Sequence, residues 1–298
     1  MRSLMRSLMH RTATHLASSL LLSALLFLAS LVSPVVPLAI ATQQIARHGV
    51  AFTFDDGMSA RGIREILAVA VAEKAPITFF PTAHSLRKYP EIWREISAAG
   101  FAIGNHTAGH RSLTSLLATG GAAAVTAAIT SWQAAATDIG ILTIPYLRPP
   151  YGERSDATDT IAVAAGITHV LNWDATFADT APRCSGTITR RIAHATIGGQ
   201  GSIVLGHTGA KGLAYEPMTA RIFAQVIASY RARSITPVSL DSMFGAPKRI
   251  IDWTLAALAT SAPAQLGEPR VPTAAPAPYS DAQMSLSPGA AAGVCAAP

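Results

Sequence analysis

Two acidic residues and two histidines have the types and spacing of a metal site. Asp55 and Asp56 follow an apolar run and precede Gly57, which permits a tight turn. His106 and His110 are four residues apart, a separation that places two imidazoles on one face of a helical turn. One carboxylate and two imidazoles are a common ligand set for Zn²⁺. We therefore expect metal-assisted hydrolytic chemistry, in which the second carboxylate accepts a proton from water.

Each of these signals also has a simpler structural explanation. The adjacent acids Asp55 and Asp56 could cap the following helix. His106 and His110 could be unrelated polar residues of a loop, or one of them could cap a helix end. Two histidines together with one acid favour the metal site over either explanation alone.

A third histidine ends another apolar run. His207 follows Gly206, which leaves room for a ligand or for a close backbone approach. The unperturbed pKa of an imidazole lies near neutrality, so His207 could protonate a leaving amine. The alternative is a buried histidine that only supports its neighbours.

A double proline follows another predicted strand. Pro149 and Pro150 fix the backbone between Arg148 and Tyr151. Arg148 could then pair with an active-site carboxylate, and Tyr151 could line the site. In isolation this motif is more often a structural turn.

Short apolar runs alternate with longer stretches rich in Ala, Leu, Ile, Glu and Arg, a pattern typical of strands alternating with helices. The predicted strands are 50–54, 77–80, 101–104, 146–148, 169–172, 202–205 and 236–239. The predicted helices are 61–73, 90–99, 118–137, 156–165, 187–196 and 217–231. This alternation predicts a parallel sheet covered by helices. We favour a closed barrel, which brings all the strand ends to one face, over an open doubly wound sheet.

Composition and charge exclude two classes of protein. Half of the 298 residues are apolar, so the chain can bury a full core and is not disordered throughout. Residues 1–41 hold three of the 23 Lys and Arg residues and none of the 17 acidic ones, which leaves the remainder a net charge of +3. No dense basic cluster follows Ala41, so we expect no nucleic-acid partner.

The two ends of the chain differ from its middle. Residues 1–41 have the order of a secretory signal peptide, with a basic start, the apolar run 16–36 and small residues before Thr42. An uncleaved membrane anchor is the alternative, because the apolar run approaches the length of a bilayer-spanning helix. Either way we expect an exported chain. Cys184 and Cys295 could then form one disulfide or stay unpaired.

We expect four segments in order along the chain. They are the signal peptide or anchor (1–41), a catalytic domain (42–245), a C-terminal helix (246–260) and a tail rich in Ala and Pro (261–298). The tail lacks the apolar periodicity of a folded segment and has the composition of a linker.

The motifs, in this order, resemble the polysaccharide deacetylase family, also called carbohydrate esterase family four. The resemblance runs from about Gly49 to Phe244. It is carried by Thr53-Phe54-Asp55-Asp56-Gly57, Ile77-Thr78-Phe79-Phe80, Ile103-Gly104-Asn105-His106-Thr107 with His110, Arg148-Pro149-Pro150-Tyr151-Gly152 and Ile203-Val204-Leu205-Gly206-His207. It implies an α/β fold, an irregular (β/α) barrel with about seven parallel strands, which agrees with the seven strands predicted above.

The resemblance also implies site roles. Asp56, His106 and His110 would hold the metal, usually Zn²⁺, with Co²⁺, Mn²⁺ and Ni²⁺ as other candidate ions. Asp55 would be the general base, and Arg148 would pair with it and orient it.

The remaining implied roles concern the leaving group and the substrate. His207 would be the general acid, and the Tyr151 backbone N–H would stabilise the oxyanion. Pro150 and Trp173 would line the substrate site. The family usually carries an Asp-Trp segment before the last histidine, and residues 172–180 depart from that pattern. Asp179 is the first candidate to orient His207, and Asp174 is the second.

The implied activity is metal-dependent removal of N-acetyl groups from an N-acetylglucosamine-type polysaccharide, such as peptidoglycan, a chitin-like oligomer or an exopolysaccharide. The alternatives are an O-acetyl esterase of xylan type on the same fold and a non-catalytic cell-wall carbohydrate-binding module. We expect a secreted, periplasmic or cell-wall location and no stable protein partner. Membrane association is expected only if the N-terminal segment is uncleaved.

Overall fold

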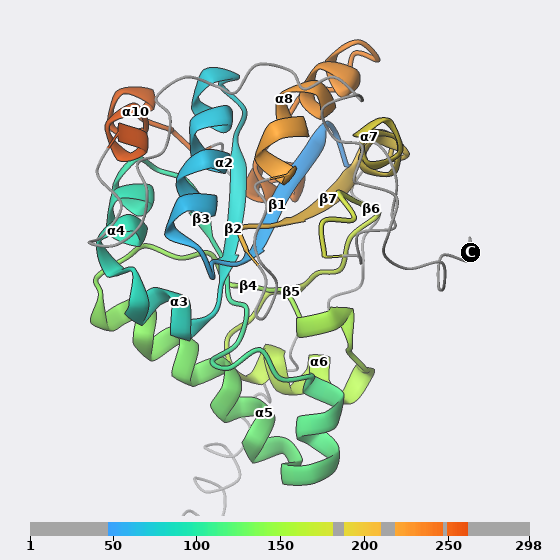
Figure 1. Cartoon of the computed structure of the whole chain (residues 1–298). Helices are drawn as coiled ribbons and strands as arrows, with labels where there is room; N and C mark the ends of the chain where they lie inside the picture. The colour runs from blue at the N-terminus through green and yellow to red at the C-terminus, as the bar shows by residue number, and fades with distance from the viewer. Residues whose placement is uncertain (1–46, 181–187, 210–217, 247–248, 262–298) are drawn as a thin grey trace, which may run out of the picture. The chain divides into compact units, whose positions relative to one another are not determined.

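The structure is a computed structural model that describes residues 47–180, 188–209, 218–246 and 249–261 (Figure 1). The signal-like segment 1–41, the tail from residue 262 and both cysteines lie outside the described residues. The predictions made for them stay predictions.

Seven short parallel strands form the centre of the domain. Five pair in the order β3-β2-β1-β7-β6, and β4 pairs with β5. A single bridge between Asn105 and Leu147 connects the end of β3 to β4. The strands are β1 (Val50–Asp56), β2 (Ile77–Pro81), β3 (Ala102–Ile103), β4 (Tyr146–Leu147), β5 (His169–Val170), β6 (Ala175–Thr176) and β7 (Ser202–His207).

This arrangement is the predicted irregular (β/α) fold with parallel strands. All the pairings between these strands are parallel. Several strands are only two residues long, and no pairing joins β5 to β6 in the described part of the chain, so the closure expected of a barrel is not observed among the described residues.

Two strand predictions need correction. The segment 236–239 is not a strand, since Pro237 makes only one isolated bridge to Val50, and a proline has no N–H to extend the ladder. The seventh strand is instead β6, which the sequence did not indicate. Its residues lie in a short segment between the acidic residues Asp174 and Asp179, without a longer apolar run to mark a strand.

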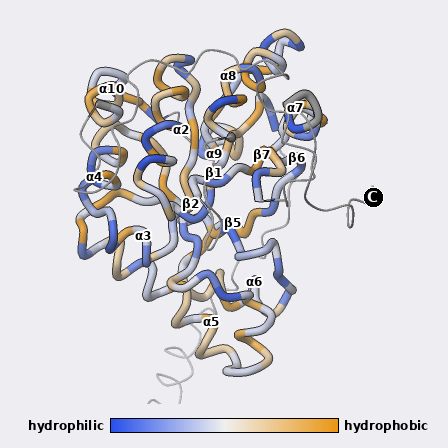
Figure 2. The backbone as a smooth tube through the Cα atoms, in the orientation of Figure 1, coloured by the Kyte–Doolittle hydropathy of each residue, from blue (hydrophilic) through white to orange (hydrophobic). Residues whose placement is uncertain are grey.

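Helices surround the strands, and along them hydrophobic and hydrophilic stretches alternate (Figure 2). They are α2 (Ala60–Ala72), α3 (Ala83–Lys88), α4 (Pro90–Ala98), α5 (Leu113–Asp138), α6 (Asp156–Ala164), α7 (Ile188–Thr196), α8 (Met218–Arg231), α9 (Leu240–Met243) and α10 (Trp253–Ser261). Helix α5 begins before the predicted 118 because the Ser112 hydroxyl caps it, accepting the N–H of Ser115, and it is kinked at Gly121, where φ is +63° and ψ is −166°. The short α3 and α9 were not predicted.

The two faces of β1 have different surroundings. Phe52 and Phe54 pack edge-on against Phe223 of α8. Because side chains alternate along a strand, Thr53 and Asp55 lie on the opposite, inner face. The same alternation in β7 puts Ile203 in the inner cluster, and His207 follows it on that face. Strand periodicity therefore places the base and the acid candidates on one side of the sheet.

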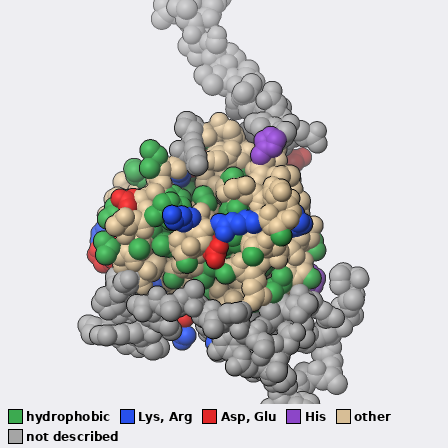
Figure 3. All heavy atoms as spheres, turned by 90° about the horizontal axis from the view of Figure 1, so that it is seen from above, with side chains coloured by type: hydrophobic (Ala, Val, Ile, Leu, Met, Phe, Trp, Pro, Cys, Tyr) green, Lys and Arg blue, Asp and Glu red, His purple; other side chains and the backbone are tan. Residues whose placement is uncertain are grey.

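Helix α5 is the one helix of the described ranges that is long and apolar enough to cross a membrane. Its Val125, Ile129 and Trp132 are buried in the core, and a core helix can have the same composition. At the end of the domain where the strands begin, basic side chains lie beside acidic and apolar ones (Figure 3).

Candidate active site

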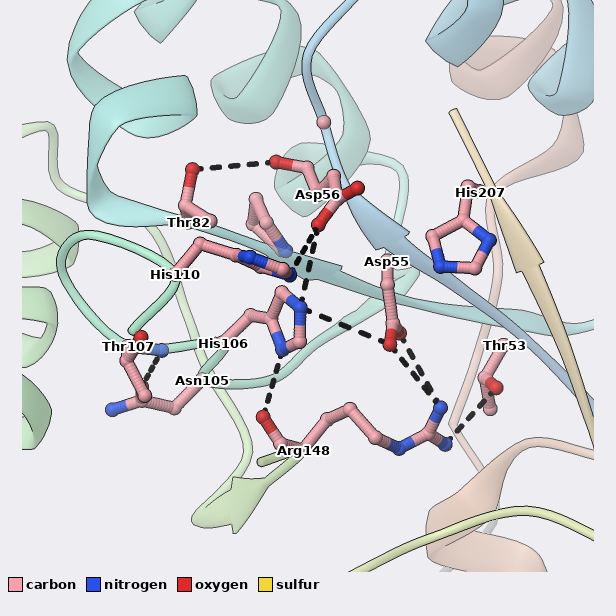
Figure 4. A network of polar contacts seen from close by, with 12 residues as sticks. Thr53, Asp55, Asp56, Thr82, Asn105, His106, Thr107, His110, Arg148 and His207 are labelled. Carbon is pink, nitrogen blue, oxygen red and sulfur yellow. Dashed lines mark hydrogen bonds and ion pairs between the residues drawn. The ribbon is translucent and has the colours of Figure 1, made fainter. Parts of the chain in front are cut away.

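Polar side chains converge where the parallel strands end (Figure 4). Asp55 and Asp56 end β1, His207 ends β7, and Arg148 directly follows β4. His106 lies three residues beyond β3. In an arrangement of parallel strands these ends meet on one face, as predicted.

Asp56, His106 and His110 form the metal-type cluster. Their ligand atoms all lie within 4.8 Å of one another. The Oδ1 atom of Asp56 is 3.4 Å from His106 Nε2 and 3.2 Å from His110 Nε2. That oxygen is buried, yet it has no hydrogen-bond partner among the described residues. A buried carboxylate oxygen without a partner is costly, so the three side chains fit a divalent cation placed between them.

The tautomer of His106 is set by the backbone. Its Nδ1 lies 2.7 Å from the carbonyl oxygen of Arg148. A carbonyl only accepts hydrogen bonds, so Nδ1 carries a proton, and Nε2 is the ring nitrogen that faces Asp56. This arrangement, with one ring nitrogen donating to a carbonyl and the other facing the ligand cluster, is the usual one for a metal-binding histidine.

The helical turn predicted for the histidine pair is wrong. Residues 107–109 form a turn, and Thr107 and His110 have φ values of +63° and +53°. The imidazole rings nevertheless lie 4.9 Å apart. Asp56 and Tyr151 also have positive φ, at +73° and +62°. Such conformations are costly for residues other than glycine and cluster at functional sites, which agrees with a site formed by these loops.

The charges in the cluster favour a cation. Burial acts to lower the pKa of His106, but the facing carboxylates of Asp55 and Asp56 outweigh it and raise that pKa. Burial and the neighbouring His106 lower the pKa of His110, which favours its neutral, ligating form. Burial acts to raise the pKa of Asp56, yet the three nearby imidazoles lower it. Asp56 is therefore ionised, and His110 has a lone pair available.

Asp55 and Arg148 form a buried ion pair. The Arg148 Nη1 atom lies 3.4 Å from each carboxylate oxygen of Asp55, and the two residues are 0% and 2% exposed. Arg148 also donates to the Thr53 hydroxyl and to the Leu171 carbonyl. The guanidinium is thus fixed on several sides and orients Asp55.

His207 and Asp179 form a second pair. The Nδ1 atom of His207 lies 2.8 Å from Asp179 Oδ1, and the backbone N–H of His207 donates to Asp179 Oδ2 at 2.7 Å. Burial acts to lower the pKa of His207, but the Asp179 carboxylate outweighs it and raises the pKa to about 9. Asp174 does not contact His207, because its carboxylate accepts the N–H of Ile203. Asp179 was the first of the two candidates.

The predicted substrate-side residues lie around this centre. The Tyr151 ring is 65% exposed and packs edge-on against His110, 4.7 Å away. Its backbone N–H has no hydrogen-bond partner within the described ranges. Trp173 is half-buried and stacks near Arg148, while Pro150 is buried.

Gly206 does not open space for a ligand. A Cβ atom at this position would lie 2.9 Å from the rings of Phe177 and Phe54. Gly206 instead allows the backbone of β7 to pack closely against these two rings, which was the alternative role expected for it.

Several supporting residues were missed. Thr53 bonds to Arg148, and its position two residues before Asp55 could have placed it on the same face. The Thr219 hydroxyl donates to Asp179 across 40 residues of sequence, and nothing local signals that contact. Thr208 was missed as well, and its hydroxyl bonds to the backbone of Gly57 and Asp55.

Comparison with known proteins shows what the domain is similar to. Residues 43–170 match the family model described as polysaccharide deacetylase. The chain is 33% identical to a chitooligosaccharide deacetylase of Rhizobium leguminosarum bv. trifolii over 67 residues, covering 22% of this chain and 31% of that protein. It is 25% identical to a peptidoglycan-N-acetylglucosamine deacetylase of Bacillus cereus, covering 67% of this chain and 69% of that one.

A solved structure shares the fold. The family 4 carbohydrate esterase from Streptomyces lividans superposes with a TM-score of 0.56 at 22% identity, covering 69% of this chain and 98% of that chain. The fold, the order of the motifs and the match over residues 43–170 agree with one another. Over residues 43–170, the chain is therefore similar to the polysaccharide deacetylase family.

Proposed function

We propose that this chain is a divalent-metal-dependent hydrolase that removes N-acetyl groups from an N-acetylglucosamine-type polysaccharide. The observation that carries the proposal is the buried, partnerless Asp56 Oδ1 facing two imidazole nitrogens, with the Asp55–Arg148 pair beside it. The names of the rhizobial and Bacillus relatives support the reaction type and the sugar class.

Asp56, His106 and His110 would hold the cation. Two imidazoles and one carboxylate suit Zn²⁺ first, and Co²⁺, Mn²⁺ or Ni²⁺ as alternatives. When bound, the cation supplies Lewis acidity, which polarises an acyl carbonyl and lowers the pKa of water.

Asp55 would act as the general base. Its carboxylate lies 3.9 Å from His106 Nε2, next to the metal-type cluster, and would take a proton from the attacking water. Arg148 holds the carboxylate in its orientation through the paired contacts at 3.4 Å. The water oxygen adds to the acyl carbon, and the free N–H of Tyr151 would donate to the developing oxyanion.

His207 would then act as the general acid. Its pKa is raised to about 9, so the ring carries a proton at neutral pH. Because Asp179 occupies Nδ1, the proton leaves from Nε2. The carbon–nitrogen bond breaks, the sugar nitrogen takes that proton, and acetate and a free amine result.

The proposed location rests on the sequence alone. We propose that the chain is exported and works on polysaccharide in the periplasm, at the cell wall or outside the cell, because residues 1–41 have the composition of a secretory signal. The polymer itself, with peptidoglycan, chitin-like oligomers and exopolysaccharide as candidates, is to be identified by assay.

Acetate release tests the proposal. The metal-loaded protein should release acetate from N-acetylglucosamine oligomers or peptidoglycan fragments and leave an equal amount of free amine. Asp55→Asn, which keeps the shape of the side chain, is the matched control and should be inactive. Release from acetylated xylan alone would establish the O-acetyl esterase instead. Carbohydrate binding that is the same in wild type and Asp55→Asn, without release, would establish a binding module.

A further inference from the structure

The backbone at Asp56 has an unusual conformation. Its φ of +73° lies in the left-handed region, and the N–H of Gly57 donates to the carbonyl of Asp55 at 3.0 Å. That bond closes a three-residue γ-turn centred on Asp56. A γ-turn with positive φ is rare and strained, so surrounding contacts must stabilise it. The turn also sets the direction of the Asp56 carboxylate, because the side chain leaves the backbone at its centre.

Thr208 hydrogen-bonds to both ends of this turn. Its hydroxyl accepts the N–H of Gly57 at 2.9 Å and donates to the carbonyl of Asp55 at 3.1 Å. Its own backbone N–H lies 3.3 Å from the same carbonyl. The side chain is 0% exposed, so water does not compete for these bonds. One buried hydroxyl therefore spans the strained residue from one side to the other.

The position of Thr208 in the fold explains how it reaches the turn. It directly follows β7, which pairs with β1 so that Asp55 lies opposite His207. Thr208, the first residue after β7, thus lies beside the point where β1 turns. His207 contributes its ring to the site, while Thr208 supports the turn that carries Asp56.

We propose that Thr208 is a positioning residue for the metal ligand Asp56. Its hydroxyl holds the turn in the left-handed conformation, which keeps the Asp56 carboxylate aimed at the two imidazoles and so strengthens cation binding. The inference rests on the metal site proposed above. Partners that orient metal ligands typically contribute about 10- to 100-fold to metal affinity, and we expect an effect of that size here.

Thr78 supplies a matched control. It is also a buried threonine, at 0% exposure, on the neighbouring strand β2. Its hydroxyl has no hydrogen-bond partner among the described residues. Thr78→Val and Thr208→Val therefore make the same chemical change in the same sheet, but only the second removes bonds to the turn.

The test measures Co²⁺ and Zn²⁺ affinity of the metal-free protein by calorimetry, together with the visible absorption spectrum of the Co²⁺ form. Thr208→Val should bind about 10- to 100-fold more weakly and give an altered Co²⁺ spectrum. Thr208→Ser, which keeps the hydroxyl, should restore both, and Thr78→Val should match the wild type. If Thr208→Val does not fold, Thr208→Ala against Thr208→Ser makes the same comparison.

Three results would overturn the inference. Thr208→Val could bind as tightly as the wild type, Thr208→Ser could be as weak as Thr208→Val, or Thr78→Val could be weakened equally. If the wild type binds neither ion, the proposed metal site itself is wrong. That outcome is distinguishable, because it shows in the wild type before any variant is compared.

Discussion

The two sides of the candidate site are stabilised in different ways. On one side, Asp55 and His106 are each 2% exposed, and each is tied to Arg148. On the other side, His207 has a more exposed side chain, at 16%, and its ring is oriented by one carboxylate, that of Asp179. The metal and base side is fixed by several contacts at the ends of the strands, whereas the acid side depends on one pair.

The difference has a chemical meaning. In the proposed reaction, the base side places two carboxylates next to each other in a buried place, where an arginine, imidazoles and a bound cation would stabilise them. The acid side must only keep one imidazole protonated and let it approach the leaving group. We therefore expect changes on the base side to affect every substrate. The effects of substitutions on the acid side should depend on the leaving group of the substrate and on pH.

The largest effect is expected from Asp55→Asn. Loss of the general base should lower kcat/KM by about 10²–10⁴-fold, for an N-acetyl sugar and for an aryl acetate ester alike, because both need water to be deprotonated. The measurement is acetate release from the two substrates. If the ester were hydrolysed at the wild-type rate, Asp55 would not be the base.

A smaller and more selective effect is expected from His207→Asn. Amide cleavage should fall by about 10²-fold, the lower end of the range for loss of a general acid. Cleavage of the aryl ester should change little, because a phenolate leaves without protonation. The ratio of amide to ester kcat is the readout. An equal loss on both substrates would assign His207 to the same step as Asp55.

The smallest effect is expected from Asp179→Asn and concerns pH. The pKa of His207 is raised to about 9, so the acid form persists up to that pH, and kcat/KM should fall as pH rises through it. Without the Asp179 charge the pKa moves back toward 6.5, and the alkaline limb of the profile should move to lower pH.

Asp174→Asn is the control for that profile. Its carboxylate bonds to the Ile203 N–H and not to His207, so the limb should stay in place. An unchanged limb in Asp179→Asn, or an equal shift in both variants, would contradict the assignment of Asp179.

The sequence predicted the base side more securely than the acid side for a physical reason. Asp55 and Asp56 are adjacent at a strand end and the histidines are four residues apart, so their ligand types are visible locally. Spacing predicted that the rings would be neighbours but gave the wrong backbone, because a separation of four also fits a turn with left-handed residues.

Other features could not be predicted from local patterns. The pairing of His207 with Asp179 bridges 28 residues and was expected only from the family resemblance, and the contact of Thr219 with Asp179, which bridges 40, was not expected. Such contacts depend on how strands and helices pack. The main helices and six of the strands were predicted because a helical periodicity or an apolar run marks each of them, whereas β6 lies in a short segment between the acidic residues Asp174 and Asp179.

The most direct test of the central claim is a metal titration of the metal-free protein, with bound ion and acetate release measured on the same samples. We predict that acetate release from N-acetylglucosamine oligomers is absent without metal and rises in proportion to bound Zn²⁺. It should reach its plateau at about one ion per chain, since a single cluster of two imidazoles and one carboxylate is present in the described residues. Full activity in the metal-free protein, or a plateau that persists in His106→Ala, would contradict the account.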